Sequence, residues 1–323
     1  MLSLSAHKVI FPIAGTFTIS RGSRTETVVV ECRISDGTHQ GRGECVPYAR
    51  YGESVESVVA QIESAASPDL DRTRLAAMLP PGAARNAVDC ALWDLEAKRA
   101  GRRVWELAGL PTPGPEITAY TLSLDAPEAM RASAETHAHR PLLKIKLGGS
   151  GDIERLRAVR AGAPGARIVI DANEGWDATT YAEIAPVILD LGVEMVEQPL
   201  PAGDDAPLAE IARPLPVCAD EAAHDRASLP ALAGKYDMVN IKLDKTGGLT
   251  EALALRDAAT AAGLQVMVGC MIGSSLGMAP ATLVAQGAAV TDLDGPLLLA
   301  ADRAHGLRYD AEGVHPPSAQ LWG

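Results

Sequence analysis

The chain of 323 residues has no cluster of lysine or arginine, no long apolar run and no closely spaced cysteines. Without a basic cluster, a formal net charge of -12 would repel nucleic acids and anionic lipids. The apolar patch at residues 1–15 is interrupted and lacks a charged start, so neither a signal peptide nor a membrane helix is expected. We therefore expect no nucleic acid and no membrane among the partners of this protein.

The cysteines are scattered, odd in number and without a C-x-x-C pair: Cys32, Cys45, Cys90, Cys218 and Cys270. This usage indicates reduced thiols and a cytoplasmic protein. The chain length, with 47% hydrophobic residues, suits one large α/β domain with a smaller domain attached. The oligomeric state is left open, and a homo-oligomer is compatible with the sequence.

The N-terminal part of the chain combines strand and helix patterns. Two β-type runs around residues 28–35 and 41–45 are separated by an Asp-Gly dipeptide, which favours a hairpin turn. Apolar residues then recur at helical spacing over residues 83–100. Three prolines between residues 111 and 115 mark the end of this part, because proline cannot continue a helix. We predict an α+β domain over residues 1–113.

Eight short apolar runs then alternate with alanine-rich helical stretches. The runs lie at residues 117–124, 142–147, 168–171, 195–197, 217–219, 238–243, 266–268 and 288–293. This alternation predicts a parallel β/α barrel over residues 114–302. Little chain follows the eighth run before a polar tail, so the last helix should be missing. The tail, residues 303–323, is expected to return to the N-terminal domain.

A polar residue ends nearly every one of these runs: Lys146, Asp171, Glu197, Asp220, Lys242 and Asp292. The carboxyl ends of all strands in a β/α barrel open on one face, so these side chains should surround one pocket.

Acidic residues end three consecutive runs, at Asp171, Glu197 and Asp220. Three buried carboxylates side by side are unfavourable unless a cation neutralises them. Oxygen ligands of this kind suit Mg²⁺, with Mn²⁺ as a substitute. Each acid alone could simply cap the following helix. Three in succession, between lysines at the same period, favour a metal site.

Lys144 and Lys146 occupy alternate positions of one strand and should project to the same, inward side. Their mutual repulsion and a nearby metal ion should lower the pKa of a lysine toward the range of a base. We assign Lys146 as the base and Lys144 as its electrostatic partner. An isolated K-x-K would more simply be a surface pair on an edge strand, but a barrel has no edge strand.

Lys242 ends the sixth run, half a turn around the ring from Lys146. Lys245 is the alternative, although it lies in a predicted loop that ends in two glycines. Two bases on opposite sides of a metal ion can remove a proton alpha to a carboxylate and return it on either face. The predicted reaction therefore inverts a stereocentre. Schiff-base chemistry at Lys242 and a non-catalytic role are the alternatives.

Asp292 and Asp294 stand in D-x-D spacing at the eighth run and should point the same way. Such a pair at the rim of a pocket suits a substrate ammonium group, whereas helix capping or solvation is the structural alternative. On the seventh run, Met271 and Gly273 are predicted substrate contacts, and Cys270 a packed thiol.

In combination, these residues resemble the enolase superfamily, in its muconate-lactonizing-enzyme subgroup. The resemblance covers essentially the whole chain. It implies an N-terminal α+β capping domain and a modified (β/α)7β TIM barrel. It also implies Asp171, Glu197 and Asp220 as metal ligands and Lys146 and Lys242 as acid/base residues. The mandelate-racemase branch is disfavoured, because it needs a histidine at the seventh strand, where this chain has Gly269-Cys270-Met271.

The lysine branch includes cycloisomerases, o-succinylbenzoate synthases, N-acyl amino acid racemases and dipeptide epimerases. The D-x-D at the eighth strand is similar to that of dipeptide epimerases, where it holds the free amino group. Residues 20–25 look like the flexible capping-domain loop, in which Arg24, or alternatively Arg21, could pair with a second carboxylate. The resemblance thus implies a Mg²⁺-dependent epimerase of dipeptides ending in glutamate, such as L-Ala-D/L-Glu from murein peptides.

Overall fold

Three antiparallel strands form the N-terminal sheet in the computed structural model, which describes residues 2–323. They are β1 (Ser3–Ile19), β2 (Gly22–Ser35) and β3 (Gln40–Cys45). The turn predicted at Asp36-Gly37 joins β2 to β3, and the Asp36 side chain accepts hydrogen bonds from the backbone N–H groups of Thr38 and His39.

A 3-10 turn η1 (Ala49–Tyr51) and four helices follow the sheet: α1 (Val55–Ser64), α2 (Arg72–Met78), α3 (Ala83–Ala100) and α4 (Val104–Leu107). Helices α1 and α3 cover one face of the sheet, and α2 and α4 pack on α3. Close packing of α3 on β3 depends on two glycines. A Cβ atom at Gly41 would lie 2.0 Å from the Ala91 carbonyl oxygen, and one at Gly43 would lie 2.1 Å from that of Ala87. The small side chains on both elements therefore bring the helix directly against the strand.

The second sheet has eight parallel strands in sequence order: β4 (Tyr120–Leu122), β5 (Leu142–Lys146), β6 (Arg167–Asp171), β7 (Val193–Glu197), β8 (Val217–Ala219), β9 (Met238–Ile241), β10 (Gln265–Val268) and β11 (Val290–Thr291). A parallel bridge between Thr118 and Thr291 joins the first strand to the last and closes the ring. Each predicted run overlaps one strand, so the predicted α/β barrel is confirmed.

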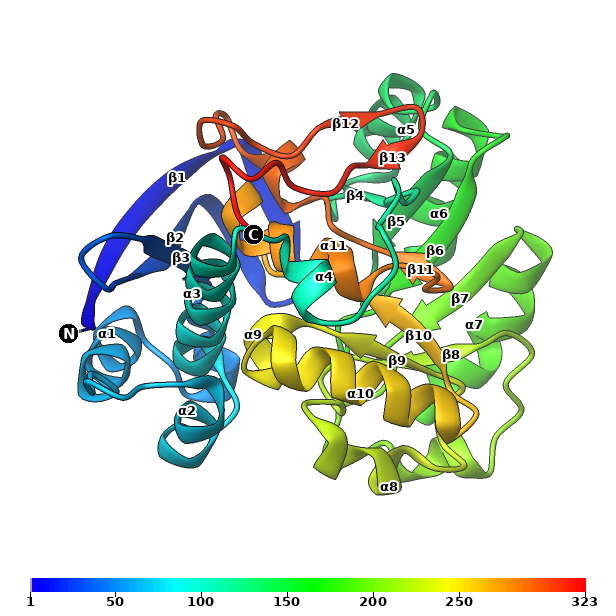
Figure 1. Ribbon diagram of the computed structural model, residues 1–323. Coiled ribbons are helices and arrows are strands. Elements are labelled where there is room, and N and C mark those ends of the chain that lie inside the picture. Colours follow the sequence, from blue (N-terminus) through cyan, green and yellow to red (C-terminus); the bar gives the residue numbers. More distant parts are fainter. Residues whose placement is uncertain (1) are drawn as a thin grey trace.

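Helices connect most of these strands on the outside of the barrel (Figure 1). They are α5 (Pro127–Thr136), α6 (Asp152–Gly162), α7 (Ala178–Asp190), η3 (Arg226–Ser228), α8 (Leu229–Leu232), α9 (Leu243–Thr246), α10 (Leu249–Ala261) and α11 (Ser275–Val284). Between β7 and β8 only the 3-10 turn η2 (Ala206–Ala209) forms, which differs from the predicted alternation. The prolines of this connection, at positions 199, 201, 207, 214 and 216, prevent a longer helix.

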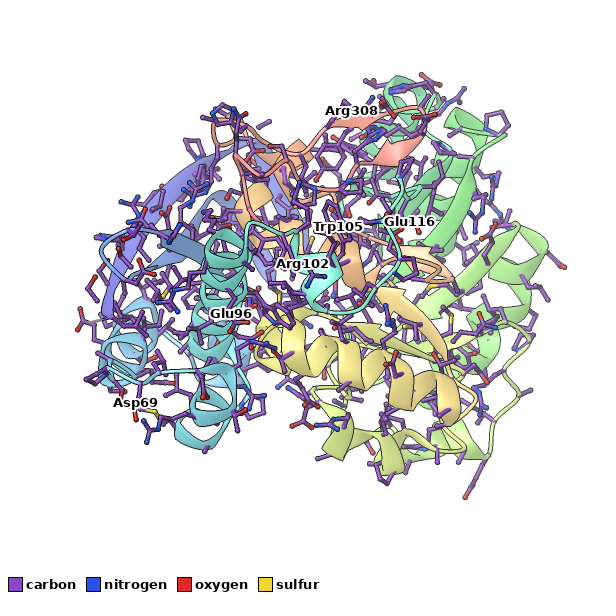
Figure 2. All side chains as sticks on the ribbon, viewed as in Figure 1. Asp69, Glu96, Arg102, Trp105, Glu116 and Arg308 are labelled. Carbon is purple, nitrogen blue, oxygen red and sulfur yellow. The ribbon has the colours of Figure 1, made fainter. Side chains whose placement is uncertain are left out.

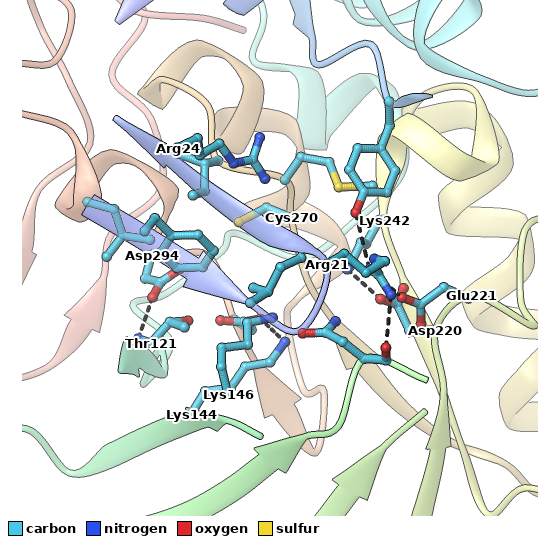
Figure 3. A pocket seen from close by; sticks show the side chains of 18 of the residues that line it. Arg21, Arg24, Thr121, Lys144, Lys146, Asp220, Glu221, Lys242, Cys270 and Asp294 are labelled. Atoms are coloured by element: carbon cyan, nitrogen blue, oxygen red, sulfur yellow. Dashed lines mark hydrogen bonds and ion pairs between the residues drawn. The ribbon is translucent and has the colours of Figure 1, made fainter. Parts of the chain in front are cut away.

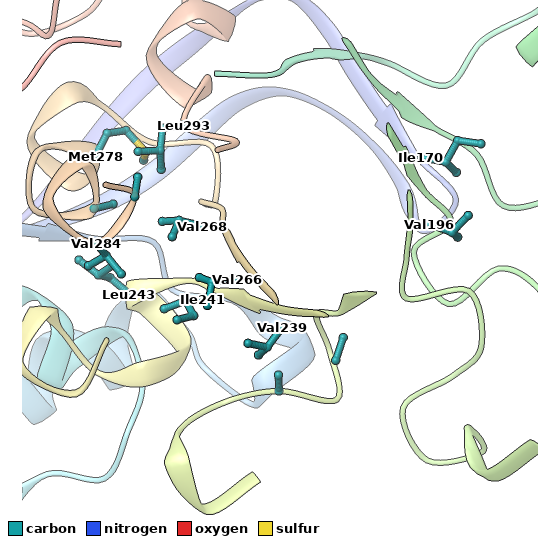
Figure 4. Packing of buried hydrophobic residues seen from close by; sticks show 14 of the residues in the cluster. Ile170, Val196, Val239, Ile241, Leu243, Val266, Val268, Met278, Val284 and Leu293 are labelled. Carbon is teal, nitrogen blue, oxygen red and sulfur yellow. The ribbon is translucent and has the colours of Figure 1, made fainter. Parts of the chain in front are cut away.

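The barrel interior and its outer wall use alternate residues of each strand. Outward side chains such as Ile170, Val196 and Val239 pack with the helices in the largest apolar cluster (Figure 4). Inward side chains near the amino ends of the strands form a separate apolar layer with one residue from each strand or the residue before it: Ala119, Leu142, Val169, Met195, Cys218, Met238, Met267 and Val290. This layer closes the bottom of the barrel.

After β11 the chain forms only the 3-10 turn η4 (Gly295–Leu298) and the short strands β12 (Tyr309–Asp310) and β13 (Gly313–Val314). Its last residues then pack on α3. The indole N–H of Trp322 donates to the Cys90 carbonyl, and the backbone N–H of Gly323 donates to Asp94. Charged side chains at the outside, such as Asp69, Arg102 and Arg308, surround this packed interior (Figure 2). Within residues 2–323, no helix is long and apolar enough to cross a membrane.

Buried acids join the N-terminal domain to the barrel. Glu44 on β3 accepts hydrogen bonds from the Ser274 backbone N–H at 2.8 Å and from Arg303 at 2.6 Å. Asp244 on α9 accepts them from Val46 N at 3.1 Å and from Asn86 Nδ2 at 2.8 Å. Burial raises the pKa of Asp244 to about 7. These side chains hold the N-terminal sheet beside the open end of the barrel.

The substitution Asp244→Asn should change how stability depends on pH. The pKa of Asp244 is about 7 in the folded protein against an ordinary value of 3.8. Between these values the folded protein retains a proton that the unfolded chain releases, so the free energy of unfolding of the wild type falls as pH rises. Asparagine cannot ionise but can still accept both hydrogen bonds. We expect the variant to gain stability relative to the wild type from about pH 4 to about pH 7. Denaturant unfolding at several pH values would measure this, and parallel curves would contradict it.

Candidate active site

The polar side chains of the site form a second layer directly above the apolar bottom of the barrel. On each strand the residue two positions after the apolar one points inward again. These residues are Thr121, Lys144, Asp171, Glu197, Asp220, Asn240, Gly269 and Asp292. A third layer, two positions further along, includes Lys146, Asn173, Lys242, Met271 and Asp294. The alternation of strand residues therefore converts the predicted strand-end pattern into two stacked polar rings.

The three consecutive acids meet at the centre of the second layer. Asp171, Glu197 and Asp220 are almost fully buried, and each offers a carboxylate oxygen within 4.8 Å of the others. Burial and the adjacent negative charge of Asp171 raise the pKa of Glu197 to about 8. For Asp171, burial acts in the same direction, but the ammonium groups of Lys146 and Lys144 outweigh it and hold its pKa below the usual range. The pKa values of Asp171 and Glu197 therefore shift in opposite directions.

Lys144, Lys146 and Lys242 each contact one or more of these acids, and Figure 3 shows the three lysines with Asp220 in the pocket. Lys144 Nζ is 2.6 Å from Glu197 Oε2, 2.7 Å from Asp292 Oδ2 and 3.2 Å from Asp171 Oδ2. On the other side of the ring, Lys242 Nζ lies 2.7 Å from Asp220 Oδ2.

Lys146 and Lys242 come from β5 and from the residue after β9, which are four strands apart in a ring of eight. Lys146 Nζ lies 2.6 Å from Asp171 Oδ2. Both side chains line the same pocket. The structure thus brings the two predicted bases to opposite sides of the acids.

The repulsion expected to lower a lysine pKa within the pair Lys144 and Lys146 is not the dominant effect at Lys144 in the metal-free protein. Burial acts to lower the pKa of Lys144, but the charges of Asp292 and Glu197 raise it well above its usual value. For Lys242, burial is likewise outweighed by Asp220 and Glu197. The sequence argument counted the repulsion between neighbouring lysines and the metal ion, and it omitted the ion pairs with the acids.

A second correction concerns Lys245. It lies in the short helix α9, where a loop was predicted, and its side chain is fully buried. Its Nζ is 2.6 Å from Asp220 Oδ1 and 3.0 Å from the Asn240 carbonyl oxygen. Lys245 is not among the residues that line the pocket, whereas Lys242 is. The geometry therefore places Lys242 in the wall of the pocket and Lys245 behind Asp220.

The acids fit a divalent cation. Three carboxylate oxygens that converge within 4.8 Å form a hard oxygen site, and the surrounding fold excludes water from it. Such a donor set suits Mg²⁺ and would also accept Mn²⁺.

Asp292 and Asp294 both line the pocket, as predicted from their spacing. Asp292 pairs with Lys144, and Asp294 accepts a hydrogen bond from the Thr121 backbone N–H at 2.6 Å. Burial and the charge of Asp292 raise the pKa of Asp294 to about 7. The Oδ1 atom of Asp292 has no hydrogen-bond partner within residues 2–323. The pair therefore retains acceptor capacity for a cationic ligand.

The segment predicted as a flexible loop, residues 20–25, is the tip of the long hairpin of β1 and β2. Only Ser20 and Arg21 form the turn, because strand pairing continues to Ile19 and Gly22. Arg21 is anchored by the Asn173 carbonyl at 3.0 Å and by Glu221 Oε1 at 2.9 Å. The hairpin tip thus lies over the open end of the barrel.

Arg24 lies on β2, half-buried in the wall of the pocket. Its guanidinium group makes no ion pair with any residue in the range 2–323, whereas Arg21 is bound to Glu221. Of the two arginines left open by the sequence, Arg24 is the one available to a ligand. The sequence reasoning did not find Glu221 or Asn173, although each lies within two residues of a predicted metal ligand.

Of the two substrate contacts predicted on the seventh strand, Met271 lines the pocket and Gly273 does not. Met271 and Cys270 line the pocket, and burial raises the pKa of the Cys270 thiol well above its usual value. Gly273 is not among the lining residues: a Cβ atom there would lie 3.1 Å from Glu44 Oε1 and 3.2 Å from a methyl group of Val46. Gly273, just before α11, therefore lies in the contact between the barrel and the N-terminal domain, where a side chain would meet Glu44 and Val46.

Comparison with known proteins gives a consistent result. Residues 3–109 match the model of the mandelate racemase / muconate lactonizing enzyme N-terminal domain, and residues 127–312 match the enolase C-terminal domain-like model. An L-Ala-D/L-Glu epimerase of Escherichia coli (strain K12) is 45% identical over 320 residues, which cover 98% of this chain and 100% of that protein. An N-acetyl-D-glutamate racemase of Pseudoalteromonas sp is 44% identical over 295 residues, covering 90% and 93%.

Solved structures show the same likeness. An enolase family member from Agrobacterium tumefaciens with homology to dipeptide epimerases, bound to sodium and L-Ala-L-Glu with an ordered loop, has a TM-score of 0.98 and 54% identity over 100% of both chains. A dipeptide epimerase from Cytophaga hutchinsonii complexed with Mg and D-Ala-L-Val has a TM-score of 0.90 and 28% identity, covering 98% of this chain and 94% of that one.

Metal binding to the wild type should depend on pH. Metal ligation requires ionised carboxylates, and Glu197 has a pKa of about 8 in the metal-free protein. We expect Mg²⁺ affinity to rise as pH increases toward about 8, with roughly one proton released per ion near neutral pH. Titration calorimetry in buffers with different ionisation enthalpies would count the protons. Proton-neutral binding near pH 7 would contradict the expectation.

Proposed function

Because the chain belongs to the enolase superfamily, in its mandelate racemase / muconate lactonizing enzyme family, we propose that it is a Mg²⁺-dependent dipeptide epimerase whose substrate is L-Ala-D/L-Glu. One observation carries the proposal. Lys146 and Lys242 face one pocket from opposite sides of the ring, with the three acids between them. Inversion of a carbon centre by two acid/base groups needs one group on each face of that carbon, and this arrangement provides both.

In the proposed reaction, one lysine removes the proton at the alpha carbon of the C-terminal residue, and the other lysine returns a proton to the opposite face. Asp171, Glu197 and Asp220 would hold the cation, which supplies positive charge to the substrate carboxylate as the enediolate forms. Lys144, held by Asp292 and Glu197, remains charged and adds to this positive field. Each base must be neutral to accept a proton, so its ion pair with the acids has to loosen when substrate binds.

The remaining side chains of the pocket suit the two ends of a dipeptide. Asp292 and Asp294 would receive the free ammonium group. Arg24 would pair with the side-chain carboxylate of glutamate, and Met271 and Phe17 provide apolar wall beside it. The hairpin tip, anchored by Arg21, would cover the bound dipeptide and exclude water.

Racemisation of an N-acylated glutamate is the second candidate, because the relative from Pseudoalteromonas sp bears the name N-acetyl-D-glutamate racemase. Arg24 would serve both substrates, since both offer a glutamate side chain. The acidic pair separates them, because an acylated nitrogen carries no positive charge and gains nothing from Asp292 and Asp294. A direct comparison of L-Ala-L-Glu with N-acetylglutamate as substrates would decide between them.

The division of labour within the chain completes the proposal. Residues 1–113 would form the capping domain, residues 114–302 the catalytic barrel, and residues 303–323 a tail that packs back on the cap. We place the enzyme in the cytoplasm, with a small peptide as its partner and without nucleic acid or membrane. The net charge of -12 and the scattered cysteines support this placement. A homo-oligomer remains compatible with it.

The two lysines should be separable by isotope exchange. Lys146→Ala and Lys242→Ala should each lower epimerisation of L-Ala-L-Glu by roughly 10²–10⁴-fold, because each removes one acid/base group. In D₂O, each variant should still exchange the alpha proton of one epimer only, and the two variants should select opposite epimers. NMR of the alpha position would follow this, with Lys235→Met, outside the pocket, as a control. Full epimerase activity in either alanine variant would exclude its assignment.

Arg24→Met should lower selectivity for a glutamate side chain. Loss of a charged hydrogen-bond partner should decrease kcat/KM for L-Ala-L-Glu by roughly 10- to 100-fold, and for L-Ala-L-Gln much less. Arg33→Met, on the same strand but away from the pocket, is the matched control. Kinetics on both dipeptides would test this. An unchanged ratio of the two kcat/KM values would remove Arg24 from the binding site.

A further inference from the structure

The three acids share a pattern in how their oxygens are used. One oxygen of each is held from behind by the protein. Asp171 Oδ1 accepts a hydrogen bond from the Asn173 backbone N–H at 2.9 Å, Glu197 Oε1 from Asn240 Nδ2 at 2.6 Å, and Asp220 Oδ1 from Lys245 Nζ at 2.6 Å. The other oxygens, Oδ2, Oε2 and Oδ2, contact the lysines of the pocket. Each carboxylate is thereby turned so that one oxygen faces inward.

Glu197 differs from its two neighbours because its holding group is a neutral side chain. Asn240 is on β9, in the same inward layer as Glu197 on β7. The rotation of a glutamate is less restricted than that of an aspartate, because glutamate has one more rotatable bond. A donor that holds one oxygen of Glu197 therefore restricts more side-chain rotation than a donor to Asp171 or Asp220 does.

The side chain of Asn240 occupies a space that depends on Gly269. A Cβ atom at Gly269, directly after β10, would lie 2.7 Å from Asn240 Oδ1 and 2.8 Å from Nδ2. The backbone of Gly269 is not in the left-handed region, so the requirement for glycine here is steric. The absence of a side chain at Gly269 thus leaves room for the amide of Asn240.

The amide oxygen of Asn240 is buried without a hydrogen-bond partner in the described part of the chain. The residue is 1% exposed, and within residues 2–323 its Oδ1 atom has no hydrogen-bond partner. Burial of an amide oxygen without a partner is unfavourable, because the oxygen loses its hydrogen bonds to water and gains none in return. An apolar side chain of similar size would avoid this, so the amide is better explained by its contact with Glu197 than by packing.

We propose that Asn240 is a positioning residue of the metal site, which acts through Glu197 and for which Gly269 provides the space. Its amide holds Oε1 and directs Oε2 toward the cation; this rests on the proposed metal site. A neutral donor orients the carboxylate without adding a positive charge that would repel the ion. Outer contacts of this kind determine metal affinity because they hold the ligand in the binding orientation before the ion arrives.

The test compares metal binding by the full-length wild type with that by Asn240→Leu, which keeps the side-chain volume and removes the donor. Calorimetric titration of metal-free protein with Mg²⁺ should show a Kd raised by about 10- to 100-fold. The Mn²⁺ EPR spectrum of the loaded variant should also differ from that of the wild type. Thermal unfolding without metal would establish that the variant is folded, since the substitution removes the unpaired Oδ1 atom but also leaves Glu197 Oε1 without its donor.

Two further variants complete the design. Gly269→Ala keeps Asn240 but displaces its amide, and it should weaken Mg²⁺ binding in the same direction. Asn86→Leu is the matched control, because Asn86 is also a buried asparagine that donates to a buried carboxylate, that of Asp244. It should leave the Kd for Mg²⁺ unchanged. Binding of Mg²⁺ by Asn240→Leu within about twofold of the wild type would overturn the role of Asn240 alone. Absence of Mg²⁺ binding by the wild type would instead overturn the metal site itself.

Discussion

Three carboxylates lie side by side in the barrel interior, and the surrounding structure has to offset their repulsion. Asp171, Glu197 and Asp220 are shielded from water. Their mutual repulsion is therefore stronger than it would be in solvent. With Asp292 they make four buried acids, and four buried lysines, Lys144, Lys146, Lys242 and Lys245, contact them. These ion pairs offset much of the repulsion between the acids in the metal-free protein, and the raised pKa of Glu197 keeps that carboxyl protonated below about pH 8. A divalent cation would add positive charge at this place, which the ionisation of Glu197, a substrate carboxylate and the loss of a lysine proton can offset.

The N-terminal domain contributes to this site by enclosing it. The hairpin of β1 and β2 reaches across the open end of the barrel, and Arg21 at its tip is held by groups next to two of the acids, Asn173 and Glu221. Buried contacts at Glu44 and Asp244 fix β3 and the residue after it, Val46, to the barrel. Because the contacts of Glu44 and Asp244 lie outside the pocket, they position the domain, and with it Arg24 in the pocket wall, without using the residues proposed to carry the reaction.

Several features were accessible from the sequence for clear physical reasons. A barrel strand is short, apolar and followed by a helix, so all eight strands could be found. Polar residues at the end of buried runs are rare enough to be informative, and the ring geometry brings them together. The connection from β7 to β8 was misjudged because its prolines were not weighed. Residues 20–25 were taken as a loop because cross-strand pairing is not visible in a single segment.

The sequence by itself determined the kind of residues at the strand ends and their order around the ring, because both follow from strand length and alternation. Only the tertiary structure decided which charges pair. The raised pKa values of Lys144 and Lys242, the place of Lys245 behind Asp220 and the contact of Asn240 with Glu197 join different strands. Distances across a barrel depend on the tilt and register of neighbouring strands, and electrostatic interactions vary steeply with such distances when water is excluded.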